Sequence, residues 1–546
     1  MQVRDMRMVA PGTTLEADLA IVGTGPAGLS IAREFFGSRV RVILLECGGL
    51  AENGEVAPSE RFESIGAPRV SEPRLVRNRV FGGSSHSWSG KCRTFDEIDF
   101  EHRAWVRYSG WPIGRADVLS YADRAAELMV LGPNVYDDAM RDILGRARPN
   151  REVSRDLLVP CFWQFARDPE QPMEFLRFGP RFLSQTTENV QAYIHAPVTH
   201  LRTDESGRRL TSLEVTPTPG RTVRIVPKIA VLAAGGLENA RLLLASRRTH
   251  TSGVGNHNDL VGRFLMDHPR ISLGHYDAKS ARAVQVRLGL FQLRQRNRTH
   301  VYSHGLALSP ALQRQKQLLN CAAYLSEHRS EDDPWDALKR LYMRRSPHYL
   351  SDMRRAVADP ANLVEGLYQR IAKGRSVRHK VDRLVFDCLV EQQPDPESRV
   401  TLSERRDELG QPIARVNWKI SELEKRSVAE LAKILAQEFD RIGLGAPVPP
   451  PWLAEGGLPD SFTDVAHPMG TTRMSDDPAH GVVDRNCRLH EVGNLYVAGS
   501  SVFPTASHAN PTLMIVAMAL RLADWLKHTH FGSATAETWK ANTVPA

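Results

Sequence analysis

Apolar and polar positions in the first fifty residues follow a pattern that predicts a strand, a tight turn, a helix and a second strand. Leu19 to Val22 is an apolar run that ends at the glycine-rich segment 23–28. Apolar residues then recur at helical spacing, namely Leu29, Ile31, Ala32 and Phe35. Gly37 is expected to end this helix, and the second strand covers Val40 to Leu45. The segment therefore resembles a βαβ unit of the usual length, about 30 residues.

The same patterns predict further strands and helices that alternate along the rest of the chain. Residues 100–150 are expected to be mainly helical, whereas 271–330 and 381–420 are expected to be mostly β structure. The other predicted strands cover 191–200, 210–227, 229–234 and 495–498. The other predicted helices cover 238–246, 421–442 and 512–526. Glycines follow the strands that end near 22, 234 and 498.

This order predicts a nucleotide-binding domain assembled from three distant pieces, with a second domain in the gaps. The three pieces are expected at 1–100, 186–270 and 456–546. A substrate domain would take the helical segment 101–185 and the segment 271–455, which contains a basic helical insertion at 335–380. The expected fold class is α/β, with a Rossmann-like domain built from discontinuous segments.

Composition and cysteine usage are typical of an ordinary globular protein. The 546 residues are 42% hydrophobic and 25% charged, and a chain of this length predicts two or three domains. No apolar run reaches the roughly 20 residues that span a bilayer, and the first 20 residues lack the apolar segment of a signal peptide. The six cysteines lie far apart without a CxxC pair. We therefore expect a cytoplasmic protein with reduced thiols and no metal site.

The chain is basic, with a net charge of +8 and a pI of about 9.2. Such a balance can indicate a nucleic acid or an anionic lipid as partner. Part of the excess is local, because 335–380 holds 11 Lys or Arg against 4 Asp or Glu. A solvated helix face is the simpler interpretation of this segment, and a partner-binding surface is the alternative. Aromatic residues are only 7%, so we expect no nucleic-acid binding.

The segment Gly23-Thr24-Gly25-Pro26-Ala27-Gly28 fits the dinucleotide-binding pattern GxGxxG. The first glycine allows the tight turn, the second lets the backbone approach a diphosphate, and the third lets helix and strand pack closely. Glu46 ends the next strand, where a carboxylate can accept hydrogen bonds from ribose hydroxyls. The motif alone does not distinguish NAD from FAD.

Two further segments carry candidate chemistry. Residues 79–88 combine two glycines with serines and a histidine, which can lie against a flat ring or can form a plain surface loop. Near the C-terminus, an imidazole at His467 or His508 is a natural base for a hydroxyl proton at neutral pH. Asn510 stands at the start of the last helix, whose N–H groups can stabilise negative charge.

Together these segments resemble the glucose–methanol–choline (GMC) family of FAD-dependent oxidoreductases. The resemblance extends over nearly the whole chain, in the family's order. It includes GTGPAG at 23–28, FGGSSHSW at 81–88, GWPIGRADVLSYADRA at 110–125, LAAGGLENARLLLAS at 232–246, VGRFLMDHP at 261–269, SRVTLS at 398–403, HPMGTTRM at 467–474 and the segment 494–520. It implies an FAD-binding domain and an α+β substrate domain with an antiparallel sheet.

The resemblance also implies roles for individual residues. His467 matches the catalytic base and Asn510 the second active-site position, whereas His508 is two residues off the motif. The residues expected to bind FAD are Gly23, Thr24, Gly25, Pro26, Ala27, Gly28, Glu46, Arg79, Gly83, Ser84, Ser85, Trp88, Val198, Ala234, Gly235, Gly499, Ser500, Asn510, Pro511 and Thr512. Some family members attach FAD through a histidine in the glycine-serine turn. This chain has Ser87 at that position and His86 before it, so non-covalent FAD is expected.

The implied activity is oxidation of an alcohol to a carbonyl, in which His467 takes the hydroxyl proton and hydride passes to flavin N5. ANPTL at 509–513 is similar to the sugar-oxidising branch, which includes pyranose oxidases and bacterial glycoside oxidoreductases. A sugar, glycoside or polyol is therefore the expected substrate, with aromatic and sterol alcohols as alternatives. The electron acceptor is oxygen or another compound, and the oligomeric state stays open. A flavin-containing lyase and an electron-transfer subunit bound to a membrane through a partner are the rival functions.

Overall fold

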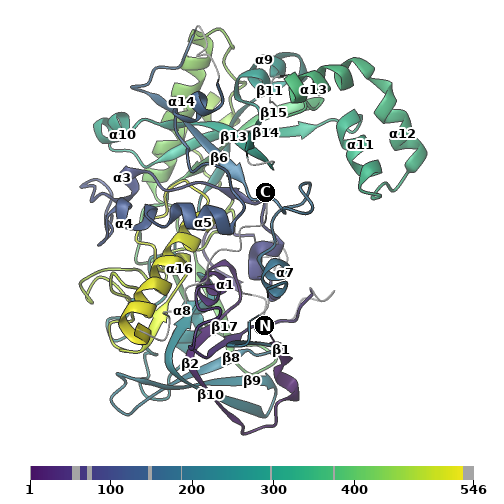
Figure 1. Ribbon diagram of the computed structural model, residues 1–546. Helices are drawn as coiled ribbons and strands as arrows, with labels where there is room; N and C mark the ends of the chain where they lie inside the picture. The colour runs from purple at the N-terminus through teal and green to yellow at the C-terminus, as the bar shows by residue number, and fades with distance from the viewer. Residues whose placement is uncertain are drawn as a thin grey trace.

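Two large sheets organise the chain in the computed structural model, which describes residues 2–51, 62–70, 77–145, 151–185, 187–295, 298–372 and 376–532. In Figure 1 the first sheet and its helices occupy the lower half of the molecule, and the second sheet occupies the upper half. An arm of three helices extends from the upper half. The candidate site lies where elements of the two halves meet.

The first sheet has eight strands in the order β1-β7-β3-β2-β10-β9-β8, with β18 paired to β10. Its strands are β1 (Gln2–Asp5), β2 (Thr14–Val22), β3 (Val42–Leu45), β7 (Val190–Ile194), β8 (Val198–Thr203), β9 (Leu210–Thr218), β10 (Arg221–Leu232) and β18 (Leu495–Val497). The strands β1, β7, β3, β2, β10 and β18 pair in parallel. They come from three distant parts of the chain.

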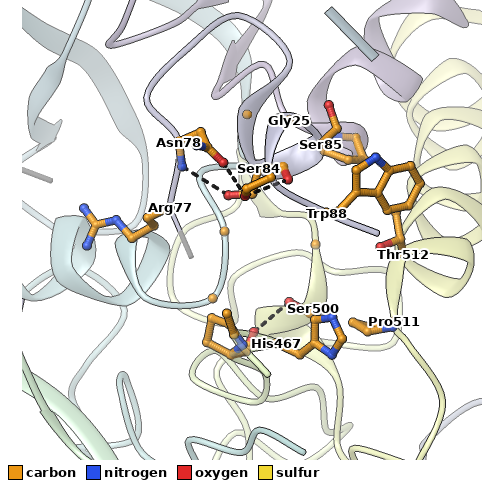
Figure 2. Close-up of a pocket in the computed structure, with 18 of the residues that line it drawn as sticks. Gly25, Arg77, Asn78, Ser84, Ser85, Trp88, His467, Ser500, Pro511 and Thr512 are labelled. Carbon is orange, nitrogen blue, oxygen red and sulfur yellow. Dashed lines mark hydrogen bonds between the residues drawn. The ribbon is translucent and has the colours of Figure 1, made fainter. Parts of the chain in front are cut away.

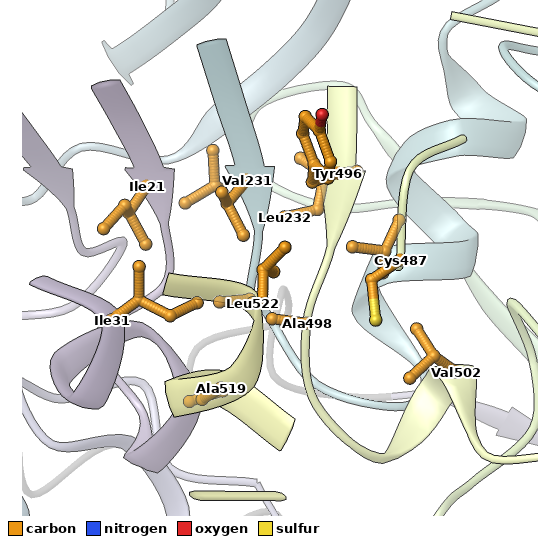
Figure 3. Close-up of a cluster of buried hydrophobic side chains, with 14 of the residues drawn as sticks. Ile21, Ile31, Val231, Leu232, Cys487, Tyr496, Ala498, Val502, Ala519 and Leu522 are labelled. Carbon is orange, nitrogen blue, oxygen red and sulfur yellow. The ribbon is translucent and has the colours of Figure 1, made fainter. Parts of the chain in front are cut away.

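Helices on this sheet bury its apolar runs. Helix α1 (Pro26–Arg33) packs against α16 (Thr512–Leu526), and α16 is apolar around most of its circumference. Figure 3 shows Ile21, Val231 and Leu232 of the sheet close to Ile31 of α1 and to Leu522 of α16. Strands buried in this way read as continuous apolar runs, which explains why they were recognisable in the sequence.

The second sheet is antiparallel, in the order β11-β15-β14-β13-β6-β5, with β12 paired to β13. Its strands are β5 (Lys91–Cys92), β6 (Leu158–Phe165), β11 (Arg270–Asp277), β12 (Phe291–Gln295), β13 (Arg298–Leu308), β14 (Cys321–Arg329) and β15 (Val381–Val390). Helix α14 (Glu422–Arg441) packs on β14 and β15 and begins with a capping box between Ser421 and Glu424. These two sheets confirm the predicted fold class.

The remaining elements are short. A three-stranded sheet joins β4 (Glu63–Ser64), β16 (Arg399–Arg406) and β17 (Pro412–Asn417). The other helices are α3 (Glu97–Phe100), α4 (Arg115–Leu119), α5 (Ala122–Leu128), α6 (Met140–Ile143), α7 (Phe178–Leu183), α8 (Glu238–Ala245), α9 (Ala278–Leu288), α10 (Pro310–Lys316), α11 (Pro334–Tyr342), α12 (Tyr349–Ala358), α13 (Pro360–Ala372) and α15 (Pro451–Ala454). Within the described residues, no helix combines the length and the apolar character needed to cross a membrane.

The prediction of β structure over 271–330 was wrong at α9 and α10. Residues 284–288 alternate between apolar and polar side chains, which favours a strand. In the structure Ala281, Val284, Gln285 and Leu288 are buried, a spacing of three and four residues that belongs to a helix. Residues 100–145 form only short helices separated by turns, so that segment is less helical than expected.

Candidate active site

One large cavity, of about 1130 Å³, is lined by residues of both large sheets. Every residue to which the family resemblance gave a catalytic or cofactor-binding role lines it, except Gly28. Figure 2 shows His467, Ser500 and Pro511 on one side of this space and Ser84, Ser85 and Trp88 on the other. The cavity thus brings together segments that lie more than 400 residues apart in the sequence.

The glycine-rich turn between β2 and α1 is closely packed at two of its three glycines. Gly23 has φ = +103°, and a Cβ atom there would lie 2.5 Å from the carbonyl oxygen of Ala233. A Cβ atom on Gly28 would lie 2.0 Å from the carbonyl oxygen of Gly23. Gly25 differs, because a Cβ atom there would meet no protein atom within 4 Å. The open space at Gly25 belongs to the cavity, at the N-terminus of α1, where anions are favoured.

Glu46 lies at the end of β3 and is only 4% exposed. Its carboxylate accepts hydrogen bonds from the backbone N–H of Thr24 at 3.3 Å, from the Thr24 hydroxyl and from the N–H of Gly48 at 2.9 Å. These contacts fix the carboxylate in the cavity wall and join the end of β3 to the glycine-rich turn. Burial, followed by the charge of Glu46, raises the pKa of the adjacent Cys47 thiol to about 12, so this cysteine is a poor nucleophile.

Positive charge collects where α8 begins at the cavity. Glu238 accepts hydrogen bonds from Arg241 at 2.5 Å and from Arg77 at 3.2 Å, and it forms an ion pair with Arg79 at 3.7 Å. Burial alone would raise the pKa of Glu238, but these three guanidinium groups lower it to about 2. One carboxylate facing three guanidinium groups leaves an excess of positive charge, which suits a bound phosphate or diphosphate.

The glycine-serine turn lies directly against the glycine-rich turn. A Cβ atom on Gly83 would lie 3.0 Å from the Cα atom of Gly25. Trp88 is fixed in the cavity wall, because its indole N–H donates to the carbonyl of Leu176 at 2.7 Å. His86 does not line the cavity, and its Nε2 atom lies 3.2 Å from the carbonyl oxygen of Phe81. The sequence analysis left the position of His86 open, and the structure turns it away from the site.

The backbone of His467 is held in place by a buried carboxylate. Its N–H donates to the two carboxylate oxygens of Asp267 at 2.9 and 3.0 Å. Asp267 pairs with Arg69 at 2.5 Å, and Arg69 also contacts Asp464 at 3.1 Å. All three of these side chains are at most 2% exposed. Burial alone would raise the pKa of Asp267, but Arg69 keeps it below its ordinary value.

The imidazole of His467 contacts a second histidine. The Nδ1 atoms of His467 and His268 are 3.1 Å apart, and Nε2 of His268 lies 3.1 Å from the carbonyl oxygen of Ala506. A carbonyl only accepts, so these partners assign the proton of neutral His268 to Nε2. Its Nδ1 is then an acceptor, and His467 must donate from Nδ1. This assignment leaves the lone pair of His467 on Nε2.

Both histidines are neutral at physiological pH. Burial, together with the neighbouring His268, lowers the pKa of His467 to about 3, although Asp267 opposes the shift. Burial likewise lowers the pKa of His268. A neutral imidazole with one accepting nitrogen is the form that takes a proton from a hydroxyl group. The electrostatics of the site therefore favour the base form of His467.

Asn510 ends the loop before α16 and is 9% exposed. Its buried Oδ1 atom has no hydrogen-bond partner among the described residues, which is costly unless a bound molecule supplies one. His508 is fully buried and lies away from the cavity, 3.3 Å from Asp96 and 3.4 Å from Arg93. Burial and Arg93 lower its pKa to about 4. Asn510 thus faces the cavity, whereas His508 belongs to a buried polar network.

Lys91 is a cavity residue that the sequence analysis missed. Its ammonium group lies 3.5 Å from the ring centre of Tyr324 and 4.3 Å from that of Trp163. Burial lowers its pKa to about 7, since the rings replace water but supply no carboxylate. Nothing in the local sequence distinguishes Lys91 from a surface lysine. His268 and Asp267 were also missed as site residues, although they lie in the segment 261–269 that carried the resemblance.

Comparisons with known proteins show what the chain as a whole is similar to. A family model described as GMC oxidoreductase matches residues 394–519. The fructose dehydrogenase large subunit of Gluconobacter japonicus is 26% identical over 94% of this chain and 98% of its own length. The 2-methyl-1,2-propanediol dehydrogenase of Mycolicibacterium austroafricanum is 23% identical over 94% and 95%. A crystal structure of formate oxidase has a TM-score of 0.56 and 17% identity, covering 96% of this chain and 99% of that one.

Proposed function

Since the chain belongs to the GMC oxidoreductases, we propose that it uses FAD to oxidise a hydroxyl group of a sugar, glycoside or polyol to a carbonyl. The observation that carries this proposal is the neutral His467 in the wall of a cavity whose other end is built from two glycine turns. FAD supplies the acceptor for the hydride that leaves the carbinol carbon.

The residues around the cavity fit such a cofactor. The open face of Gly25, the guanidinium groups of Arg77 and Arg79 and the N-terminus of α1 suit a diphosphate. Glu46 suits a ribose, and Trp88 offers a flat surface. The unpartnered Oδ1 atom of Asn510 calls for a donor from a bound molecule. The remaining candidate contacts are Gly83, Ser84, Ser85, Val198, Ala234, Gly235, Gly499, Ser500, Pro511 and Thr512.

In the proposed mechanism His467 is the general base. Its Nε2 atom accepts the substrate hydroxyl proton, while its Nδ1–H stays bonded to His268. Asn510 positions the same hydroxyl group through its amide without competing for the proton. General-base catalysis is typically worth about 10²–10⁴-fold, so removing the imidazole should lose most of the turnover.

The test is anaerobic reduction of the bound flavin by substrate in His467→Ala. We expect the variant to retain its yellow cofactor and to be reduced about 10²–10⁴-fold more slowly. His480→Ala is a suitable control, because the His480 side chain is 65% exposed and remote from the cavity. Reduction of His467→Ala at the wild-type rate would show that another group takes the proton.

The substrate class rests on the relatives and on the cavity wall. The large subunit of fructose dehydrogenase is a relative over almost its whole length. The second sheet contributes Lys91, Arg270, Ser303, Tyr324 and Ser326 to the cavity, and such polar groups suit a molecule with several hydroxyls. The 2-methyl-1,2-propanediol dehydrogenase makes a small diol the second candidate.

An anaerobic titration can separate the two substrate classes. A panel of ketoses, aldoses, glycosides and polyols is compared with aliphatic diols and aromatic alcohols, and flavin absorbance is followed. The proposal predicts that at least one sugar, glycoside or polyol bleaches the flavin at the lowest concentration. Faster bleaching by a diol or an aromatic alcohol would move the assignment to the alternative class.

Attachment of FAD is proposed to be non-covalent. Ser87 occupies the position at which the resemblance places a linking histidine, and its hydroxyl donates to Asn78 at 2.5 Å. His86 is turned to Phe81 outside the cavity. Acid denaturation should therefore release all flavin into the supernatant, whereas flavin that stays with the precipitated protein would contradict the proposal.

The electron acceptor and the compartment complete the proposed function. Oxygen or another acceptor reoxidises the flavin, which an oxygen-uptake measurement with and without a dye acceptor distinguishes. All six cysteines are free thiols, and five of them are buried. This usage supports a reducing, cytoplasmic location.

A further inference from the structure

The helices α11, α12 and α13 form an arm that extends from the second sheet, and we propose that this arm docks on an anionic phospholipid surface. The arm is inserted between β14 and β15 and stands out from the body of the molecule in Figure 1. None of its described residues lines the candidate active site. The proposal is therefore independent of the chemistry proposed for that site.

Helix α13 presents its apolar stripe to solvent. Val364, Leu367, Tyr368 and Ile371 recur at spacings of three and four residues, which places them on one face. Their exposed fractions are 69%, 51%, 52% and 70%. In a globular protein such a stripe normally faces the core. The exposure of Val364, Leu367 and Ile371 leaves a continuous apolar surface along α13 that is open to a partner.

The orientation of α13 is set by its opposite face. Gly366 is the buried residue of this helix, and a Cβ atom there would lie 2.4 Å from the indole ring of Trp335 in α11. The indole N–H of Trp335 donates to Asn362 at 3.0 Å, and Glu365 accepts from Arg378 at 2.7 Å. Close packing and polar contacts therefore turn the apolar stripe outward.

Helix α12 is arranged in the same way. Its exposed apolar residues are Tyr349, Leu350, Met353 and Val357, with exposed fractions of 63%, 81%, 46% and 72%. The inward face carries the buried Asp352 and Ala356. Asp352 accepts from Arg340 of α11 at 2.5 and 2.9 Å and from the Ser346 hydroxyl at 2.9 Å. An ion pair with a buried carboxylate thus holds this second apolar face toward solvent.

Acidic groups of the arm are withdrawn from its surface. The four carboxylates of residues 334–372 are half-buried or buried. Each of them is bonded within the protein: Asp336 to Arg329, Asp352 to Arg340, Asp359 to the N–H of Asn362 and Glu365 to Arg378. On the described helices of the arm, every acidic side chain is therefore paired within the protein, and the most exposed of them, Glu365, is 37% exposed.

Basic groups, in contrast, lie on the outside of the arm. Lys339, Arg344, Arg354 and Arg370 are exposed and have no carboxylate partner within 4 Å among the described residues. Arg345 is exposed too and pairs with Glu174 at 2.8 Å. The outer surface of the arm is thus apolar and cationic at once, and this combination needs a partner that is apolar and anionic.

An anionic bilayer has both properties. Amphipathic helices with aliphatic side chains on one face and Arg or Lys beside it lie in the interface of such membranes. Tyrosines, which the arm exposes at 342, 349 and 368, are enriched at the headgroup level. Protein interfaces are instead depleted of charge at their apolar centres. A nucleic acid would use the cations but not the aliphatic side chains.

Vesicle sedimentation tests the proposal with the full-length protein. We expect binding to vesicles of phosphatidylcholine mixed with phosphatidylglycerol, little binding to phosphatidylcholine alone, and weakening by salt because exposed charges are screened. The variant V364S/L367S/I371S should bind at least about tenfold more weakly. The variant R354E/R370E should lose the preference for the anionic lipid.

Matched controls keep the outcome clear. Met8→Ser and Leu458→Ser remove exposed apolar side chains outside the arm and should bind vesicles as the wild type does. The substituted side chains of the arm are exposed, so circular dichroism and the melting temperature should not change in any variant. An environment-sensitive fluorophore on Leu367→Cys should shift to the blue on anionic vesicles, and one on Met8→Cys should not.

Three outcomes would overturn the proposal. The first is that the wild type binds neither kind of vesicle. The second is that V364S/L367S/I371S binds anionic vesicles as tightly as the wild type. The third is a self-associated species in sedimentation velocity that this variant abolishes, together with no vesicle binding, which would assign the surface to a second copy of the chain.

Discussion

The Nδ1 atom of His467 lies 3.1 Å from the Nδ1 atom of His268, which is itself anchored on the carbonyl of Ala506. The carbonyl can only accept a hydrogen bond, so it determines which ring nitrogen of each histidine carries the proton. A neutral chain of this kind selects the tautomer of His467 without placing a negative charge against its ring. His268 is thereby a positioning residue for the proposed base.

Replacing His268 should slow the reaction without emptying the site of flavin. His268→Leu removes the acceptor for Nδ1–H of His467, so the tautomer is no longer fixed. We expect flavin reduction to fall roughly 10- to 100-fold. His268→Gln keeps an accepting oxygen and should recover part of the rate. Equal rates for the Leu and Gln variants, measured by anaerobic stopped flow, would argue for a merely structural role.

The pH profile should show a base that stays neutral well into the acid range. Burial lowers the pKa of His467 to about 3, and the neutral form is the active one. As pH falls, kcat/KM should therefore stay level through pH 6.5 and decline only at more acidic values. Half-loss of kcat/KM near pH 6.5, the ordinary value for histidine, would contradict this electrostatic environment.

Two glycines of the turn should respond to alanine in opposite ways. Gly28→Ala places a methyl group 2.0 Å from a carbonyl oxygen of the protein, so we expect loss of several kcal/mol of stability, about 3 or more. Gly25→Ala meets no protein atom within 4 Å and should fold normally, but its methyl group would occupy the space proposed for the diphosphate. The measurements are the melting temperature of the flavin-free protein and the dissociation constant of FAD.

The two variants test separately where the diphosphate binds and how tightly the turn is packed. A stable Gly25→Ala protein that binds FAD as tightly as the wild type would place the diphosphate elsewhere. A Gly28→Ala protein as stable as the wild type would mean that the backbone yields more easily than the packing indicates.

A buried ion pair that does not line the cavity should matter for stability. Arg103 and Glu391 make two contacts of 2.5 and 2.7 Å, and their side chains are at most 1% exposed. Glu391→Ala leaves the Arg103 cation buried and unpaired, which should cost about 3–5 kcal/mol. Glu422→Ala removes one member of an exposed pair with Lys425 and should change the unfolding free energy by less than about 1 kcal/mol. Denaturant unfolding measures both, and similar losses would contradict the role of burial.

The sequence was sufficient to predict features that depend on residues close together in the chain. The strand, glycine turn and helix at 19–33 follow from apolar runs and from glycines whose packing tolerates no Cβ atom, as Gly23 and Gly28 show. Helix α14 was predicted within a residue at each end, because an apolar stripe of that length allows few alternatives. The expected catalytic residues His467 and Asn510 do line one cavity, although their roles stay predictions.

What could not be predicted depends on contacts between distant segments. The pKa of Lys91 is lowered only because folding buries it beside Trp163 and Tyr324. No local sequence pattern predicts this contact. The tautomer of His467 depends on His268 and Ala506, which are remote in the chain. The alternating residues 284–288 fit a strand as well as a helix. The pattern of buried residues in the tertiary structure is what identifies them as part of α9.

The threading of the first sheet has a consequence for biosynthesis. Strand β18 and helix α16 belong to the last tenth of the chain, yet β18 pairs with β10 and α16 packs on α1. A nascent polypeptide therefore keeps the faces of α1 and β10 uncovered until residues 495–526 have been synthesised. Any product truncated before residue 495 leaves these faces uncovered, so chaperones and proteases will recognise it.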